Sequence, residues 1–183
     1  MNKTLIVSMI AIAVLGIYVP RVRADASSIS DPSANRNQLV SVTDERPEIL
    51  KAYLTAKGSP MADDADFFVS EADRLNLDWK LVVAIAGVES TFGQQIPKGS
   101  FNAWGWGVFT GASDGVHFQN WQDGITEVSQ GLRYRYMDKG AKTVDEIGDI
   151  YAASPAWSFK VKWFVNDIEQ FQAEIGNRLA VTI

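Results

Sequence analysis

Residues 81–88 (LVVAIAGV) limit most strongly what this chain can fold into. At helical periodicity the segment is apolar on nearly every side, whereas a helix on a protein surface keeps one polar face. A helix that is apolar all round has to be enclosed by other elements of its domain. We therefore predict a core helix over residues 79–90, with Asp78 as its N-cap, around which the rest of the domain packs.

Amphipathic helical patterns separated by turn residues flank this core helix on both sides. Before it, the pattern predicts helices over residues 49–56, which Gly58-Ser59-Pro60 end, and over residues 64–75. After it, the pattern predicts a helix from the N-cap Asn120 to Gly140, a second from the capping box at Thr143 to about Tyr151, and a last one from Ser154 and Pro155 to Gly176 and Asn177. The sequence therefore predicts a mostly α domain over residues 46–183.

Residues 99–119 break the helical pattern and are rich in glycine and aromatic residues. Within them, GVF (107–109) and VHF (116–118) flank a Gly/Ser/Asp turn, which is typical of two short strands joined by a turn. We expect a small β-hairpin inserted after the core helix.

The N-terminus carries the pattern of an export signal. Lys3 precedes an uncharged, apolar run over residues 5–19, which is shorter than the roughly 20 residues that a helix needs to span a bilayer. Small residues at Ala24 and Ala26 offer cleavage sites, so we predict that residues 1–26 are a signal peptide and that residues 27–45 (ASSISDPSANRNQLVSVTD) are a flexible spacer. Arg21 and Arg23 follow the apolar run, where a secreted protein usually lacks positive charge, and leave an uncleaved membrane anchor as the alternative.

Either alternative predicts an exported protein that is extracellular, periplasmic or associated with the cell wall. The formal net charge is −5, and removal of residues 1–26 takes away three basic residues and one acidic residue, which leaves −7. This charge argues against nucleic acid as a partner. Without cysteine, neither disulfides nor thiolate metal sites can support the fold, and we expect a monomer stabilised by packing.

Glu89 is the feature of the core helix that calls for an explanation, because it follows the apolar residues with no Lys, Arg or His beside it. Desolvation favours the protonated form of a carboxyl group and raises its pKa, as a proton donor at neutral pH requires. Glycoside hydrolysis needs such a donor, because the leaving sugar oxygen is protonated as its bond breaks. The alternative is that Glu89 lies on the exposed end of the helix, solvated or paired with Lys98.

A loop of aromatic residues and glycines, FNAWGWG (101–107), follows closely after Glu89. Aromatic faces stack on sugar rings, glycines let a ligand approach the backbone, and an asparagine amide can bind an N-acetyl group. The loop therefore favours an aminosugar cleft. The alternative is a small hydrophobic core beneath the hairpin.

Four segments in this order are similar to a known family: AIAGVESTFG (84–93), SFNAWGWG (100–107), HFQNWQDGI (117–125) and YAASPAWSFKV (151–161). They resemble the bacterial glucosaminidase domain (mannosyl-glycoprotein endo-β-N-acetylglucosaminidase-like), a member of the lysozyme-like superfamily related to the lytic transglycosylases. The resemblance covers roughly residues 62–170, and four ordered motifs are more specific than any single one. It implies a lysozyme-like helical fold and cleavage of peptidoglycan glycan strands, without a cofactor.

Carried over residue by residue, the resemblance implies that Glu89 is the general acid and that Ser90 helps to orient it. Asn102 and Trp106 would line the cleft and bind the substrate, and Tyr151 would face the catalytic glutamate. From the aromatic loop itself we expect Trp104 to bind the substrate as well. A half-buried structural tyrosine is the alternative for Tyr151.

The chain also departs from the family, in which many members place a second acidic residue in a longer β-lobe. Here Asp114 is the only acid between Trp106 and Phe118, and it lies in GASDG (111–115), which favours a turn residue. The only histidine, His117, argues against a metal centre or a Ser-His-Asp triad, and we expect it to be structural. Asp123 is expected to complement the start of the helix that Asn120 caps, and Glu127 to be solvated.

A single assured acid leaves several functions open. Water can attack the anomeric carbon, helped by the substrate's acetamido group or by Asp114, which is hydrolysis. Alternatively the muramyl 6-hydroxyl attacks it, which gives the 1,6-anhydro product of a lytic transglycosylase. A non-catalytic module that binds cell-wall glycan is a further alternative, although a pure binder has no need of a buried acid, and a helical interaction protein whose aromatic residues are only core is the last.

Overall fold

The computed structural model describes residues 43–108 and 115–181, with side chains described as far as Asn177. The predicted signal peptide, most of the predicted spacer and Asp114 lie outside these residues. The helical segments of the described part are α1 (Arg46–Ala56), η1 (Ala62–Asp64), α2 (Ala65–Leu75), α3 (Leu81–Ser90), α4 (Trp121–Gly131), η2 (Leu132–Tyr136), η3 (Met137–Lys139), α5 (Val144–Tyr151) and α6 (Trp157–Val181). This confirms the mostly α fold class.

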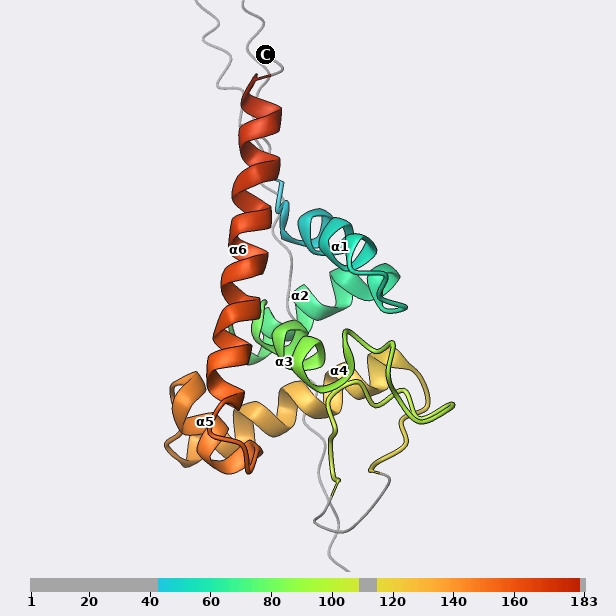
Figure 1. Cartoon of the computed structure of the whole chain (residues 1–183), viewed down its shortest axis with the longest axis vertical. Helices are drawn as coiled ribbons and strands as arrows, with labels where there is room; N and C mark the ends of the chain where they lie inside the picture. The colour runs from blue at the N-terminus through green and yellow to red at the C-terminus, as the bar shows by residue number, and fades with distance from the viewer. Residues whose placement is uncertain (1–42, 109–114, 182–183) are drawn as a thin grey trace, which may run out of the picture. The chain divides into compact units, whose positions relative to one another are not determined.

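The predicted core helix is α3, which is buried from Leu81 to Gly87. It packs against α6 and α4, while α1 packs against α2 and α6, so the apolar segment is enclosed as its composition requires. Figure 1 shows α6 as one long helix that passes beside both α3 and α1. Within the described residues, no helix combines the length and the apolar character that crossing a membrane requires.

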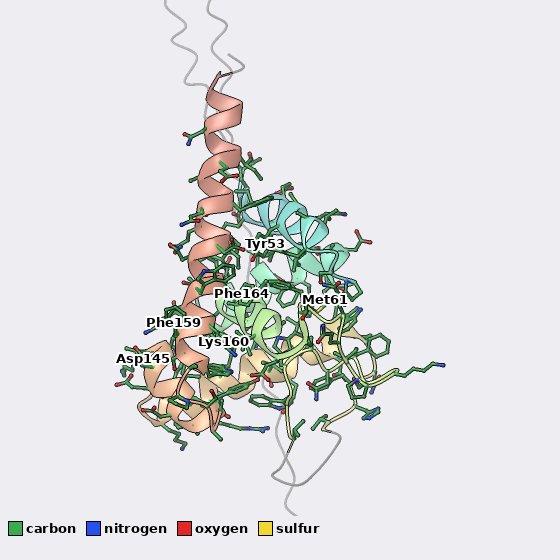
Figure 2. All side chains as sticks on the ribbon, viewed as in Figure 1. Tyr53, Met61, Asp145, Phe159, Lys160 and Phe164 are labelled. Carbon is green, nitrogen blue, oxygen red and sulfur yellow. The ribbon has the colours of Figure 1, made fainter. Side chains whose placement is uncertain are left out.

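Tyr53 joins α1 to α6 through a polar contact at the edge of this core (Figure 2). Its hydroxyl donates a 2.8 Å hydrogen bond to Oδ2 of Asp167, and Lys57 Nζ lies 2.7 Å from the same oxygen. Burial alone would raise the pKa of Asp167, but the hydrogen bonds from Lys57 and Tyr53 outweigh it and lower the pKa. This contact holds α6 in place against the domain.

The expected β-hairpin is not seen in the described residues. Residues 107–108 and 116–118 form no strand, and Phe109 and the predicted turn lie outside the described part. Two backbone hydrogen bonds, Val116 N to Trp106 O at 3.0 Å and Phe118 N to Ser100 O at 2.8 Å, still hold residues 116–118 against residues 100–106. Gly105 and Gly107 both have positive φ angles, which bend the chain away from the extended backbone that a strand needs.

Local capping signals predicted several helix ends correctly. The Oδ1 of Asn120 accepts a 2.8 Å hydrogen bond from Asp123 N at the start of α4, and Thr143 and Glu146 form the predicted capping box of α5. Gly140, with φ 116°, follows the helical stretch that begins with α4. This stretch is not one regular helix, because η2 is a turn of π-helix and η3 is 3-10.

Other predicted helix ends were wrong. The α1 helix begins at Arg46 and not at Ile49, because Pro47 fits within the first turn of a helix. The α3 helix begins at Leu81 and not at Trp79, because Asp78 accepts a hydrogen bond from Lys80 N in a turn that precedes the helix. The α6 helix begins at Trp157, two residues after Pro155. It continues through Gly176 to Val181, because a glycine that keeps a right-handed conformation weakens a helix without ending it.

Candidate active site

Glu89 lies in the last turn of α3, where the chain leaves the core. Thr91 and Phe92 have φ angles of 53° and 58°, and this left-handed turn ends the helix directly after Ser90. The Oε1 of Glu89 accepts a 2.6 Å hydrogen bond from Nε1 of Trp157, the first residue of α6. Its Oε2 lies only 3.2 Å from the point that a Cβ on Gly105 would occupy. The carboxyl group is therefore held between α6 and the aromatic loop.

The pKa of Glu89 is raised above the ordinary value of 4.5 by burial. The residue as a whole is exposed, but the enclosure of its carboxyl end by Trp157 and the Gly105 loop outweighs two opposing effects. These are the Trp157 hydrogen bond and the positive charge of Lys160, each of which lowers the pKa. The cation that acts on Glu89 is thus Lys160 of α6, and not Lys98. Figure 2 shows Lys160 on α6, the helix that packs against α3.

Asn102 holds the aromatic loop in shape from within. Its Nδ2 donates to Trp106 O and to Val116 O, both at 2.9 Å. Its Oδ1 accepts from the backbone N–H groups of Trp104 at 3.3 Å and Trp106 at 2.9 Å. Because these bonds use both donors and both acceptor positions of the amide, Asn102 has no free group for an N-acetyl substituent. Its position supports a structural role in place of the predicted contact with substrate.

Ser90 joins the end of α3 to the same loop. Its buried hydroxyl donates a 2.7 Å hydrogen bond to Ala103 O and accepts a 2.9 Å hydrogen bond from Gly93 N. The bond to Ala103 O fixes the position of the aromatic loop relative to Glu89. Ser90 also lines the pocket of Glu89, but its hydroxyl is held by these bonds within the protein and is placed to position Glu89 and the loop.

The prediction that Trp104 binds substrate was wrong. Its side chain is completely buried, its Nε1 donates a 2.9 Å hydrogen bond to Val82 O, and its ring packs against Phe68 and Phe118. Trp104 thus anchors the loop in the core, as the alternative of a small hydrophobic core predicted for this position.

Trp106 instead belongs to a group of aromatic side chains beside Glu89, which we call the aromatic cluster: Trp106, Tyr136, Tyr151 and Trp157. The rings of Tyr151 and Trp157 are stacked, with centroids 4.8 Å apart and an angle of 23° between their planes. Trp106 lies 5.9 Å from Tyr151 and 6.2 Å from Tyr136, measured between ring centroids. The close approach of Trp106 to α4 depends on Gly131, where an added Cβ would clash with the indole ring.

Tyr151 directs its hydroxyl to the aromatic loop, where it donates a 2.7 Å hydrogen bond to Trp104 O. Burial raises its pKa well above 10, and the negative charge of Glu89 and the nearby Tyr136 add to this shift. The phenol therefore stays protonated at any physiological pH. The electrostatic effect of Glu89 on Tyr151 agrees with the predicted proximity of these two residues.

Two pockets adjoin at Gly105 and Val108, which line both. The first, of about 160 Å³, contains Glu89, Asn102 and Gln95 among its lining residues. The second, of about 320 Å³, is lined by Trp106, Tyr136 and Tyr151 of the aromatic cluster together with Arg135 and Ile150. Glu89 is the only acid among the described residues that line the two pockets. A ligand that crossed from one pocket to the other over Gly105 would pass Oε2 of Glu89.

The remaining acidic candidates lie elsewhere or have other partners. Asp123 accepts a 3.0 Å hydrogen bond from Gln119 N at the start of α4, as expected. Glu127 is not simply solvated, because it accepts a 2.9 Å hydrogen bond from Arg135. His117 is exposed. Among the described residues, no group of three or more His, Asp or Glu side chains could hold a metal ion.

Sequence reasoning missed Trp157 and Lys160 as site residues. Both lie in the segment YAASPAWSFKV, from which only Tyr151 was taken, and their distance from Glu89 in the sequence gave no local signal. A comparison with family models finds no match for this chain, and a search of curated proteins finds none either.

Proposed function

We propose that this chain is an exported glycosidase with a lysozyme-like helical fold, which cleaves the glycan strands of peptidoglycan in the manner of a β-N-acetylglucosaminidase. Glu89 is the general acid. The observation that carries the proposal is the position of this carboxyl group, with its raised pKa, in a small pocket that adjoins a larger pocket with aromatic walls.

The hydrogen bond from Trp157 gives the two oxygens of Glu89 different roles. Oε1 accepts from the indole N–H, and a carbonyl oxygen is the better acceptor, so the protonated acid carries its hydrogen on Oε2. Oε2 is the oxygen next to Gly105. A glycosidic oxygen bound over Gly105 receives this proton as its bond to the anomeric carbon breaks, and the electron pair of that bond leaves with the oxygen.

The anomeric carbon then carries an oxocarbenium-like charge that a nucleophile must quench. In hydrolysis, the substrate's own acetamido oxygen supports the carbon from one face. Water then adds to the anomeric carbon and gives one proton to the carboxylate of Glu89, which restores the acid. Tyr151 and Trp106, which is 7% exposed, line the larger pocket in which the sugar lies, and Tyr151 also holds the backbone of the aromatic loop at Trp104 O.

The second candidate function is a lytic transglycosylase, and it is favoured by the single acid among the described lining residues. Here Glu89 first gives its proton to the leaving oxygen and then takes the proton of the muramyl 6-hydroxyl. The hydroxyl oxygen bonds to the anomeric carbon of the same sugar, so a 1,6-anhydro end forms and no water is consumed. Both candidates assign the same role to Oε2.

Mass spectrometry of the soluble products of purified protein and peptidoglycan tests the proposal. New reducing-end N-acetylglucosamine is expected, and anhydromuramyl ends would identify the second candidate. Glu89→Gln should abolish the products and keep glycan binding, because the amide oxygen can still accept from Trp157.

Glu174→Gln is the matched control, because Glu174 is an exposed glutamate of α6 and lines neither pocket. It should release the same products as the wild-type protein. Binding without any product would reject catalysis and indicate a wall-binding module, whereas the absence of both binding and product would reject the glycan proposal.

A further inference from the structure

The larger of the two pockets holds a charge that general acid catalysis does not use. Arg135 is the only charged side chain among the described residues that line this pocket. The other walls are aromatic or aliphatic side chains and glycines. A cation at the edge of an aromatic pocket indicates a ligand that combines an apolar face with a negative group.

The backbone that carries Arg135 is irregular at this point. Residues 132–136 form η2, a single turn of π-helix between α4 and η3, and two of them, Arg135 and Tyr136, line the pocket. A π-helical turn contains one more residue than a regular helix would need, so it changes the direction in which later side chains leave the helix. Such turns occur frequently at functional sites.

The contacts of Arg135 hold its guanidinium at the mouth of the pocket. The guanidinium carbon lies 5.9 Å from the centroid of the Trp106 ring, and one terminal nitrogen donates a 2.9 Å hydrogen bond to Glu127. A guanidinium has five N–H donors, and the bond to Glu127 uses one of them. The side chain remains 65% exposed, so a ligand can reach the other donors.

Because the whole chain is negatively charged, a local cation matters for the binding of a negatively charged substrate. The net charge is −5, which works against binding of a negatively charged polymer. Two cations lie at the site nevertheless, Arg135 in the larger pocket and Lys160 near Glu89. Lys160 acts on the acid, whereas Arg135 lies beside the sugar-sized pocket with no acid in its described lining.

We infer that Arg135 binds a carboxylate carried by the glycan, so that the larger pocket prefers a sugar with an acidic substituent to a neutral N-acetylhexosamine. This inference rests on the proposed function. Peptidoglycan offers such a carboxylate from two sources: the lactyl group of muramic acid in strands without peptide, and the stem peptide in strands that carry it. The test has to distinguish the two.

Three substrates make this distinction: peptide-free strands with the lactyl carboxylate, the same strands after conversion of that carboxylate to a methylamide, and strands with stem peptides. The KM of each is measured for the wild-type protein, and the Kd of each is measured for Glu89→Gln, which keeps the binding site. We expect the carboxylate strands to bind about 5-fold more tightly than the methylamide strands, which is the scale of an exposed ion pair. The preference should weaken as salt is added.

Arg135→Gln should remove this preference, and Arg135→Lys, which keeps the charge without the planar fork, should retain part of it. Arg133→Gln is the matched control, because Arg133 is in the same π-helical turn, pairs with Asp138 at 3.0 Å and does not line the pocket. It should keep the full preference. An effect of Arg135→Gln confined to the strands with peptides would support the inference and assign the carboxylate to the peptide.

Equal affinity of the wild-type protein for carboxylate and methylamide strands, with no effect of Arg135→Gln on the strands with peptides, would overturn the inference. If Arg133→Gln lost the preference for carboxylate strands as fully as Arg135→Gln does, the inference would be overturned too. The shape of the π-helical turn, and not the charge of Arg135, would then account for the preference. Either result leaves Glu89-dependent cleavage intact. Failure of the proposed function would look different, since no substrate would be cleaved at all.

Discussion

The indole Nε1 of Trp157 and the Oε1 of Glu89 are joined by a hydrogen bond of 2.6 Å between two residues 68 positions apart. This bond connects the first turn of α6 to the last turn of α3. It orients the carboxyl group and lowers its pKa. Burial by the same surroundings raises the pKa, and this second effect is the larger one. The acidity of Glu89 is therefore set by the contact between two helices.

Replacement of Trp157 by Phe removes this hydrogen bond and should raise the pKa of Glu89, because the bond stabilises the carboxylate. Activity that needs the protonated acid is lost as pH rises through this pKa, so the alkaline limb of kcat/KM should move to higher pH. The pH profile of product release measures the shift. Trp163→Phe, at an exposed position of α6, should leave the limb in place, and an unmoved limb in Trp157→Phe would contradict the role of the bond.

Replacement of Lys160 by Gln removes the positive charge that lowers the pKa of Glu89, and should move the same limb in the same direction. The movement should be smaller than in Trp157→Phe, because the hydrogen bond is the stronger of the two effects. It should also shrink in high salt, since Lys160 is exposed. Lys162→Gln, whose lysine pairs with Asp145 at 2.7 Å, is the control for loss of a charge from this helix. A shift toward lower pH in Lys160→Gln would refute the electrostatic argument.

Gly105→Ala should reduce kcat/KM by about 10- to 100-fold, because a displacement of the acid by a fraction of an ångström disturbs its alignment with the glycosidic oxygen. The new Cβ would lie 3.2 Å from Oε2 of Glu89, and φ at this residue is 60°. Gly99→Ala is a closely matched control, because Gly99 has a φ of 74° but no atom within 4 Å of an added Cβ. Both variants should lose about 1 kcal/mol of stability to backbone strain. Equal activity of the two variants would show that contact with Glu89 is unimportant.

Asn102→Ala should lower the free energy of unfolding by about 2–4 kcal/mol, because it leaves buried backbone groups of the aromatic loop without their partners. Urea unfolding followed by tryptophan fluorescence measures this loss. Asn166→Ala, at an exposed position of α6, should change stability by no more than about 0.5 kcal/mol. If Asn102→Ala instead kept full stability and lost only glycan affinity, the amide would be a ligand for the substrate, as the sequence had suggested.

Residues near one another in the chain determined the helical fold and the position of the acid within it. The apolar run before Glu89 required an enclosed helix, and the side chains of Asn120 and Thr143 predicted the starts of α4 and α5, because capping depends on atoms only a few residues apart. The four motifs that suggested a glycosidase are also local patterns. The stop expected at Gly176 failed, because glycine ends a helix only where the chain adopts a left-handed conformation.

Tertiary structure decided which of these residues form the site. Trp104 and Trp106 are two positions apart and equally aromatic, yet one ring is fully buried against Phe68, whereas the other is 7% exposed and lines the larger pocket beside Tyr151. Trp157 and Lys160 reach Glu89 only because α6 packs along α3. Sequence by itself determined which side chains could carry the chemistry. Their roles depended on packing between distant segments, which sets burial, hydrogen-bond partners and charge at each position and which no local pattern encodes.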